Sequence, residues 1–337
     1  MKAAIPGEMR VAAREQYGDH RTIRIIRKEI PEPGPYDLLV KVEVTAATAA
    51  DSFLRSGTPK FARIFLGLRK PRNPYIGTAF SGTIVKQGDK VLGFNVDDAV
   101  FGETGLYFSA NAEYLVVDSR EVVCKKPDSL SHEEAACFSD GPLTSFNFIH
   151  HVGEAKQGDR ILINGGAGAL GTAAIQIARA MGCRVVTTSS KENFALLKSL
   201  GADETLDYRD DKVFKGVSRY DLIYDTVGKL DYKQIKHQLT PQGRFVSPVL
   251  SSNVLWESLK SALPFRKKKV RFEATGMKKP DELRTYLSSL LKLSAGRKLN
   301  IHIGHRFELA DLSMAHELID TGHKKGNCII NFKEQNK

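Results

Sequence analysis

Three glycines at a fixed spacing are the residues of this chain that point most directly to a chemistry. Gly166, Gly168 and Gly171 satisfy the pattern Gly-x-Gly-x-x-Gly. A pyrophosphate can approach the backbone only where no Cβ atom intervenes, and the N–H groups at the start of a helix then bind the anion. This pattern follows an apolar run and precedes a helical one, which is the context that the chemistry needs. We therefore predict that the turn, including Ala169 and Leu170, binds a dinucleotide.

The end of the next predicted strand indicates which dinucleotide that is. A site for NAD(H) normally carries a carboxylate about 20 residues beyond the glycines, where it accepts a hydrogen bond from the ribose 2′-hydroxyl. No Asp or Glu occurs between Gly171 and Lys191, and the strand ends instead in Thr188, Ser189 and Ser190. The hydroxyl groups of these residues and the cation of Lys191, which follows them, suit a 2′-phosphate. We therefore predict NADP(H). A second interpretation, compatible with the first, is that the two serines cap the next helix.

These residues need a parallel sheet to position them. From about residue 130 the chain alternates apolar runs with helical periods, as βαβ units do. Strands are predicted at residues 160–164, 183–188, 204–208, 220–225 and 243–247. An amphipathic helix is predicted to begin at the glycine turn and to end at Gly182, where a left-handed cap would lie. Right-handed crossovers between such strands produce a doubly wound sheet.

The first 120 residues or so have a different character. β-branched runs such as residues 38–44 are separated by Pro and Gly, for example at residues 31–35, which predicts short and mostly antiparallel strands. The chain has 337 residues, of which 42% are hydrophobic and 26% charged, and this length and composition favour two globular domains. The four cysteines have no CxxC spacing, so neither a disulfide framework nor a thiolate zinc site is indicated.

The formal net charge is +11, part of it concentrated in the run from Arg266 to Arg271. We interpret this run as a solvated loop leading into a strand; the alternative is a patch that binds RNA or an acidic membrane. The N-terminus lacks the apolar run of a signal peptide, and no stretch approaches the roughly 20 apolar residues that span a bilayer. We therefore expect a cytoplasmic protein without a membrane span.

Further motifs follow one another along nearly the whole chain in the order that a known family has. They lie at residues 42–46, 51–57, 74–77, 81–82, 141–144, 200–203, 208, 225–228 and 241–244. On these motifs the chain resembles the medium-chain dehydrogenase/reductases, and among them the zinc-free quinone oxidoreductase branch. The resemblance implies an α/β protein with a GroES-like β-rich catalytic domain, a doubly wound Rossmann domain and an active site in the cleft between them.

The resemblance also implies a domain division and a set of cofactor contacts. Residues 1–125 would form the N-terminal part of the catalytic domain, residues 126–265 the Rossmann NADP-binding domain, and residues 266–337 a C-terminal segment that returns to the catalytic domain. The residues that would line the nicotinamide end are Thr144, Asp225, Val227 and Gly228. Those that would surround the adenosine 2′-phosphate are Ser189, Ser190, Lys191 and Tyr208.

The chain departs from the zinc-dependent relatives at the metal-binding positions. Thr48 stands where they have a cysteine, residues 77–79 read Gly-Thr-Ala in place of Gly-His-Glu, and the cluster of four cysteines is missing. Because catalytic zinc needs three Cys, His or carboxylate ligands, we predict no metal site. Many zinc-free relatives carry Asn and Tyr at the positions of Thr48 and Phe53, so the proton donor stays open. Thr48, Asp51 and Arg55 are the candidate catalytic residues, although Arg55 can equally pair with a surface carboxylate.

The hypothesis that follows is hydride transfer from NADPH to a small hydrophobic quinone or α,β-unsaturated carbonyl, without zinc. One alternative is an enoyl thioester reductase, and another is a nucleotide-binding protein that acts mainly by association with RNA or a membrane. Residues 61–72 mix apolar and basic side chains and form either a lid over the acceptor or an ordinary surface helix. We expect a homodimer and no nucleic-acid partner.

Overall fold

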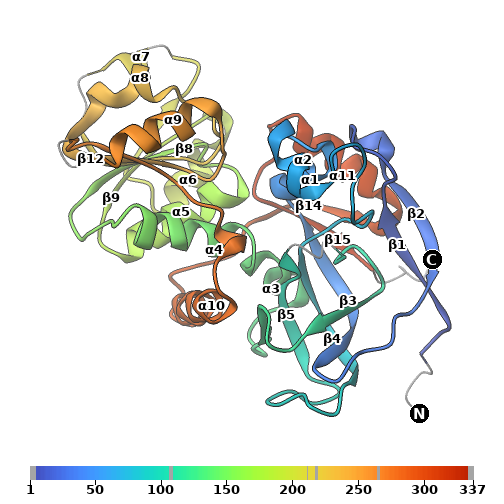
Figure 1. Ribbon diagram of the computed structural model, residues 1–337. Helices are drawn as coiled ribbons and strands as arrows, with labels where there is room; N and C mark the ends of the chain where they lie inside the picture. Colours follow the sequence, from blue (N-terminus) through green and yellow to red (C-terminus); the bar gives the residue numbers. More distant parts are fainter. Residues whose placement is uncertain (1–4, 106–108, 211, 217–218, 264–265, 333–337) are drawn as a thin grey trace. The chain divides into compact units, whose positions relative to one another are not determined.

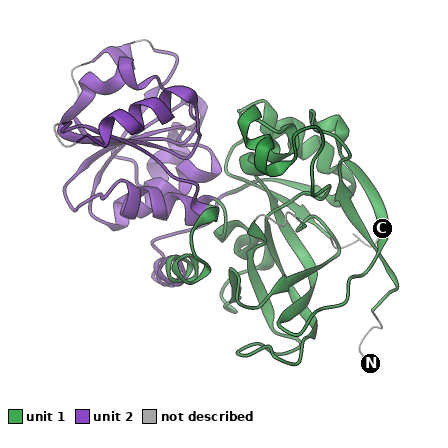
Figure 2. Cartoon of the chain, viewed as in Figure 1, with its two compact units in different colours: residues 1–140, 276–287, 303–337 green, residues 141–275, 288–302 purple. Residues whose placement is uncertain are grey.

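The computed structural model describes residues 5–105, 109–210, 212–216, 219–263 and 266–332, and these form two compact units (Figure 2). Unit 1 comprises residues 1–140, 276–287 and 303–337, and unit 2 comprises residues 141–275 and 288–302. The domain division after residues 125 and 265 stays a prediction, and residue 265 itself lies outside the described residues.

The described part of unit 2 is built on a six-stranded parallel sheet with the order β10-β9-β8-β11-β12-β13 (Figure 1). The strands are β8 (Arg160–Asn164), β9 (Arg184–Ser189), β10 (Glu204–Asp207), β11 (Tyr220–Asp225), β12 (Leu239–Ser247) and β13 (Lys269–Phe272). The chain starts at central β8, moves outward to β10, and then returns to β11 on the other side, so the predicted doubly wound sheet is confirmed. The basic run leads into β13, as expected.

The apolar sequences of β8 and β11 explain why these two strands lie at the centre of the sheet. Ile161, Leu162 and Ile163 of β8 and Leu222 and Ile223 of β11 are all fully buried. A strand that is covered on both faces carries a continuous apolar run rather than an alternating one, and both strands have that sequence. The sheet can therefore hold the residues at its strand ends in fixed positions.

The helices of unit 2 lie on the two sides of the sheet, with α5 and α9 on opposite sides in Figure 1. They are α4 (Gly141–Phe146), the π-helical η4 (Asn147–Val152), α5 (Ala169–Ala180), η5 (Lys191–Asn193), α6 (Phe194–Ser199), α7 (Lys212–Lys215), α8 (Tyr232–Ile235), η6 (Lys236–Gln238) and α9 (Ser252–Ser261). Helix α10 (Pro280–Ala295) begins in unit 1 and ends in unit 2. The predicted cap after α5 is confirmed, since Gly182 has a φ of 79°.

Unit 1 contains a two-stranded sheet and a seven-stranded sheet among its described residues. The first pairs β1 (Glu8–Ala13) with β2 (Arg24–Glu29). The second has the order β14-β15-β3-β4-β5-β7, with β6 also paired to β3; its strands are β3 (Asp37–Ala47), β4 (Ala79–Gln87), β5 (Ala99–Glu103), β6 (Tyr114–Asp118), β7 (Val123–Lys125), β14 (Ile303–Glu308) and β15 (Asn327–Asn331). All pairs except β14 with β15 are antiparallel, so the expectation of mostly antiparallel strands in the N-terminal part is confirmed.

The C-terminal segment completes unit 1, because β15 pairs with β3. The remaining short elements are η1 (His20–Thr22), α1 (Ala49–Ser56), η2 (Lys60–Ala62), α2 (Arg63–Leu66), α3 (His132–Phe138), η7 (Thr275–Met277), η8 (Leu309–Asp311) and α11 (Leu312–Asp320). Leu312, Ala315 and Ile319 of α11 pack with Cys328 and Ile330 of β15 in one buried cluster. Helix α11 is thereby fixed, and it can anchor residues of α1.

Candidate functional site

The glycine turn between β8 and α5 shows what each of its three glycines does. A Cβ atom at Gly166 would lie 2.0 Å from Thr187 Oγ1, and one at Gly171 would lie 2.2 Å from Gly165 O. Those two glycines are therefore required by packing within the protein. Among the described residues, a Cβ atom at Gly168 would meet Gly165 O alone, at 3.7 Å, so these residues leave open space at this position. That space lies at the residue that precedes the first turn of α5.

Helix α5 offers positive charge at this space. The first N–H groups of an α-helix have no partner within the helix, and in α5 these belong to Ala169, Leu170 and Gly171. The aligned peptide dipoles add a partial positive charge at the same end. Helix α4, which carries Thr144, is held against this end, because Ser145 Oγ donates to Leu170 O at 2.8 Å. The predicted turn residues and Thr144 thus come together at the start of α5.

The end of β9 presents two serine hydroxyl groups in a defined orientation. Ser189 and Ser190 are buried, and Asn193 Nδ2 donates a hydrogen bond of 3.0 Å to the Oγ atom of each. Since each Oγ accepts from Asn193, each hydroxyl hydrogen stays available to donate to an anion. Asn193 was not identified from the sequence. In the sequence, only its position four residues after Ser189 could have indicated that Asn193 contacts that serine.

A second strand end lies beside these serines. Tyr208 N donates to Ser189 O at 3.3 Å, so the residue after β10 is placed next to the end of β9. The Tyr208 side chain is 40% exposed, and the guanidinium of Arg209 lies 5.3 Å from the centre of its ring. Lys191 is exposed at the start of η5. Sequence reasoning missed Arg209, which adds a cation to the predicted group of Ser189, Lys191 and Tyr208.

Asp225, at the end of β11, holds the following turn together. Its carboxylate accepts hydrogen bonds from Asn164 Nδ2 at 2.8 Å and from the backbone N–H groups of Val227, Gly228 and Leu230 at 2.8 to 3.2 Å. Burial raises the pKa of Asp225, and these hydrogen bonds oppose that rise. The carboxylate is therefore committed to shaping the turn, while Val227 is 38% exposed. A ligand at this turn would meet Val227 rather than the Asp225 side chain.

Two of the three candidate catalytic residues of unit 1 form a capping box at the start of α1. Thr48 Oγ1 accepts from Asp51 N at 3.1 Å, and Asp51 Oδ2 accepts from Thr48 N and from Thr48 Oγ1, both at 2.9 Å. Both side chains are 1% exposed. Burial raises the pKa of Asp51 to about 7. The hydroxyl hydrogen of Thr48 is thus directed to Asp51 rather than to solvent.

Arg55 is held by α11. Its guanidinium is 2% exposed, and Nη2 donates to Asp320 Oδ2 at 2.7 Å and to Ser52 Oγ at 3.0 Å. Of the two interpretations of Arg55, the structure shows the ion pair, here with the last residue of α11. A catalytic role for Thr48, Asp51 and Arg55 stays a prediction.

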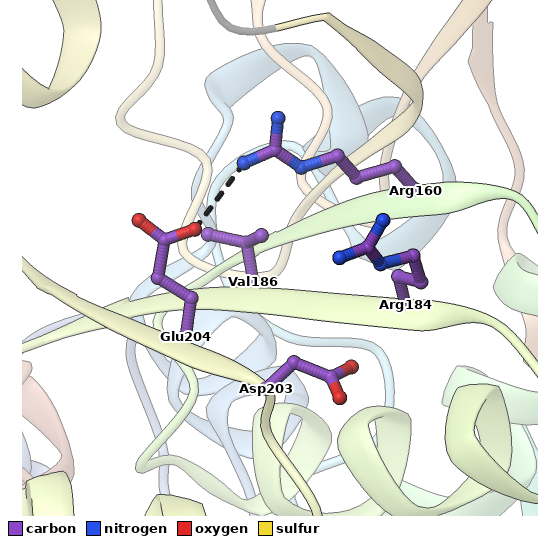
Figure 3. Close-up of a pocket in the computed structure, with 5 residues that line it drawn as sticks. All are labelled: Arg160, Arg184, Val186, Asp203 and Glu204. Atoms are coloured by element: carbon purple, nitrogen blue, oxygen red, sulfur yellow. Dashed lines mark hydrogen bonds and ion pairs between the residues drawn. The ribbon is translucent and has the colours of Figure 1, made fainter.

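The hollow drawn in Figure 3 lies at the edge of the sheet of unit 2 opposite to the glycine turn and the two serines. Its volume is about 320 Å³, and it is lined by Arg160, Arg184, Val186, Asp203 and Glu204. These residues stand at the amino ends of β8, β9 and β10, whereas the glycine turn and the serines stand at the carboxyl ends. Ligands of open α/β sheets bind outside the carboxyl ends of the strands. The carboxyl edge is therefore the candidate ligand site.

Two kinds of feature are absent from the described residues. No group of three or more His, Cys, Asp or Glu in the described part of the chain could hold a metal ion. Within the same residues, no helix is both long enough and apolar enough to cross a membrane.

Comparisons with known proteins agree with this architecture. Residues 200–330 match the family model of the zinc-binding dehydrogenases. The zinc-type alcohol dehydrogenase-like protein C16A3.02c of Schizosaccharomyces pombe is 32% identical over 228 residues, which are 64% of each chain. The chain therefore spans slightly less than two thirds of that relative.

Solved structures match over nearly the whole length. The quinone oxidoreductase of Coxiella burnetii superposes with a TM-score of 0.85 and 28% identity, over 97% of this chain and 100% of that one. The quinone oxidoreductase of Escherichia coli, solved as a complex with NADPH, has a TM-score of 0.82 over 96% of this chain and 100% of that one, and its 18% identity shows the fold alone. The predicted fold class, a GroES-like domain with a Rossmann domain, is thereby confirmed. Together, these matches support the medium-chain dehydrogenase/reductase superfamily, and its quinone oxidoreductase-like branch, as the family of this chain.

Proposed function

We propose that this chain catalyses the reduction of a quinone or another α,β-unsaturated carbonyl by NADPH, without zinc. The observation that carries the proposal is the pair of serine hydroxyl groups at the end of β9, both fixed by Asn193. They lie where a dinucleotide places its adenosine ribose, and the carboxylate that recognises a 2′-hydroxyl is absent from that strand end.

The residues of unit 2 fit such a cofactor. The N–H groups at the start of α5 and the space at Gly168 would hold the pyrophosphate. Ser189, Ser190 and Lys191 would hold the 2′-phosphate by charge-assisted hydrogen bonds, with Arg209 as a further cation. The nicotinamide, when bound, supplies the hydride.

The zinc-free part of the proposal rests on residue types in unit 1. Thr48 occupies the position of a zinc ligand, and its hydroxyl group is hydrogen-bonded to Asp51. Conjugated acceptors spread the charge that arrives with hydride over several atoms, so they need neither a metal nor a strong acid nearby. We propose a small hydrophobic substrate of this class, a homodimer and a cytoplasmic location.

An isosteric substitution tests the cofactor assignment. Asn193→Asp replaces the amide donor by a carboxylate that accepts from the serine hydroxyl groups and repels a phosphate. We expect NADPH affinity to fall by at least about tenfold, which corresponds to about 1.4 kcal/mol, and NADH affinity to stay within about threefold of wild type. Both affinities can be measured by fluorescence titration.

The control is Asn193→Ala, which removes the donor without adding charge, so a smaller loss for NADPH is expected. Turnover with quinones, enones and enoyl thioesters, each with NADPH and with NADH, then identifies the acceptor class. Equal rates with NADH, or equal losses for both cofactors in the Asp variant, would contradict the 2′-phosphate assignment. One tightly held zinc per purified chain would contradict the metal-free reaction.

A further inference from the structure

The segment from Lys60 to Arg72, named here the basic–apolar segment, lies on the surface of unit 1 next to α1 and carries apolar side chains that the fold does not cover. It contains η2 and α2 and ends in a turn. Figure 1 shows α2 beside α1. The exposed fractions are 47% for Phe61, 59% for Ile64, 77% for Phe65 and 71% for Leu68. Scattered exposed apolar residues are normal on a protein surface, but four within eight residues form a patch that indicates a binding surface.

The backbone of this segment is fixed, so the exposure does not come from a loose loop. Arg63 turns back onto α1, where Nε donates to Gly57 O at 3.0 Å and Nη2 donates to Ser56 O at 3.1 Å. The Arg63 guanidinium also lies 4.4 Å from the ring centre of Tyr17, whose hydroxyl donates to Gly67 O at 2.8 Å. The apolar side chains are therefore held outward by contacts on the opposite side of the segment.

Cations surround these apolar side chains. Lys60, Arg69, Lys70 and Arg72 are exposed, and no ion pair joins any of them to another described residue. Elsewhere in unit 1, several exposed arginines do have carboxylate partners, as Arg21 has Asp19, Arg120 has Asp118 and Arg306 has Glu133. The sequence contains no Asp or Glu at all between Asp51 and Asp89. The segment thus presents uncompensated positive charge around an apolar centre.

This combination selects one kind of partner. A nucleic acid offers phosphates, but it gives four aliphatic and phenyl side chains little to bury against. A bilayer that contains anionic lipids offers both parts, since acyl chains lie just beneath a layer of negative headgroups. We propose that the basic–apolar segment docks unit 1 onto an anionic lipid bilayer, with Phe65 and Leu68 inserted among the acyl chains and Arg69 and Lys70 at the headgroups. This goes beyond the proposed reaction and does not depend on it.

Co-sedimentation with vesicles tests the proposal on the full chain. Vesicles of phosphatidylcholine mixed with phosphatidylglycerol should bind the protein, and this binding should weaken as salt is added, whereas vesicles of phosphatidylcholine alone should bind it weakly. Arg69→Gln with Lys70→Gln should lower the partition coefficient by about 25-fold, from about fivefold for each cation near an anionic surface. The matched control is Arg297→Gln with Lys298→Gln, an exposed adjacent pair in unit 2 with the same change in charge, which should leave binding unchanged.

The apolar contribution is tested separately. Phe65→Ser with Leu68→Ser should lower the partition coefficient by at least about tenfold, because two side chains lose their burial in the acyl region. The control is Leu92→Ser, at a position of unit 1 that is 85% exposed and outside the segment, and it should bind as wild type does. The melting temperature of every variant reports folding without reference to the reaction.

Each of the following outcomes would overturn the proposal. The first is that vesicles with and without phosphatidylglycerol bind the protein equally, or that the Arg69→Gln, Lys70→Gln variant binds as tightly as its control. A second such outcome is that the charge variant and the apolar variant of the segment both still bind vesicles, while Trp256→Ser abolishes binding. Trp256 lies with Leu255 and Leu259 among the exposed apolar residues of α9. A third is that sedimentation shows a dimer and that Phe65→Ser with Leu68→Ser dissociates it, which would make the segment an interface between copies of the chain. Loss of NADPH turnover with vesicle binding intact would contradict only the proposed function.

Discussion

Asp51 is a carboxyl group that the fold removes from water. It is 1% exposed, and its hydrogen-bonding partners at 2.9 Å are the N–H and hydroxyl groups of Thr48. Burial raises its pKa to about 7, and the hydrogen bonds from Thr48 are too weak to cancel that effect. The side chain thus exchanges a proton near neutral pH.

This shift predicts a particular dependence of stability on pH. An Asp in the unfolded chain titrates near pH 3.8, so between about pH 4 and 7 the folded protein keeps a proton that the unfolded chain has lost. The free energy of unfolding should therefore decrease as the pH rises through this window. For Asp51 alone the decrease from pH 5 to 8 should be on the order of 2 to 3 kcal/mol. Asp51→Asn should remove that part, as measured by urea unfolding at the two pH values.

Glu103 is a second contributor to this pH dependence. Burial raises its pKa to about 7 as well, so it contributes in the same window and with the same sign. Glu103→Gln should reduce the pH dependence further when it is combined with Asp51→Asn. A wild-type difference between pH 5 and 8 in the Asp51→Asn variant would show that Asp51 is ionised throughout.

At the scale of elements, the turn between β8 and α5 combines two glycines that packing requires with a third, Gly168, that packing does not require. Packing inside unit 2 excludes a side chain at Gly166, where Thr187 of β9 stands in the way, and at Gly171, where the turn's own backbone does. None of the described residues excludes a methyl group at Gly168, which also has an ordinary φ of −77°. The three glycines of one motif are thus present for different reasons.

Substituting the first two glycines one at a time should separate these reasons. Gly166→Ala should destabilise the protein by about 1 to 3 kcal/mol, because the new Cβ atom would displace Thr187. Gly168→Ala should destabilise the protein by only about 0.5 to 1 kcal/mol, the cost of Ala at a helix N-cap, and lower the affinity for dinucleotides by at least about tenfold. Thermal unfolding and fluorescence titration measure the two effects. If Gly168→Ala binds NADPH as wild type does, no phosphate approaches that residue.

At the scale of the whole molecule, local and distant contacts differ in how well the sequence predicts them. The strands of unit 2 and the glycine turn were predicted because their signals lie within a few adjacent residues. The ion pair of Arg55 with Asp320 joins residues 265 positions apart, and no local pattern could indicate it. The placement of Tyr208, and of Arg209 on its ring, next to the end of β9 likewise depends on the pairing of β10 with β9. The site was therefore predicted in its motif and missed in part of its surroundings.

The two units have separate cores, which predicts an uneven response to the cofactor. A ligand stabilises the part of a protein that must be folded to bind it, by about 2.7 kcal/mol at a concentration 100 times its Kd. With NADPH, amides in β8, β9 and α5 should exchange hydrogen about 100-fold more slowly, while those in β3 and β4 should change little. Hydrogen exchange followed by mass spectrometry measures this. Equal slowing in both units would show that they unfold together.

The parallel arrangement of the sheet in unit 2 has a practical consequence. Because every strand runs the same way, the hollow around Arg184 and the Arg160–Glu204 ion pair is one full strand length away from the glycine turn. A dye, or a tether to a solid support, attached at the exposed position of Arg184 would thus be separated from the proposed dinucleotide site by the length of the strands. That position allows unit 2 to be labelled or immobilised while its opposite edge remains accessible to ligands.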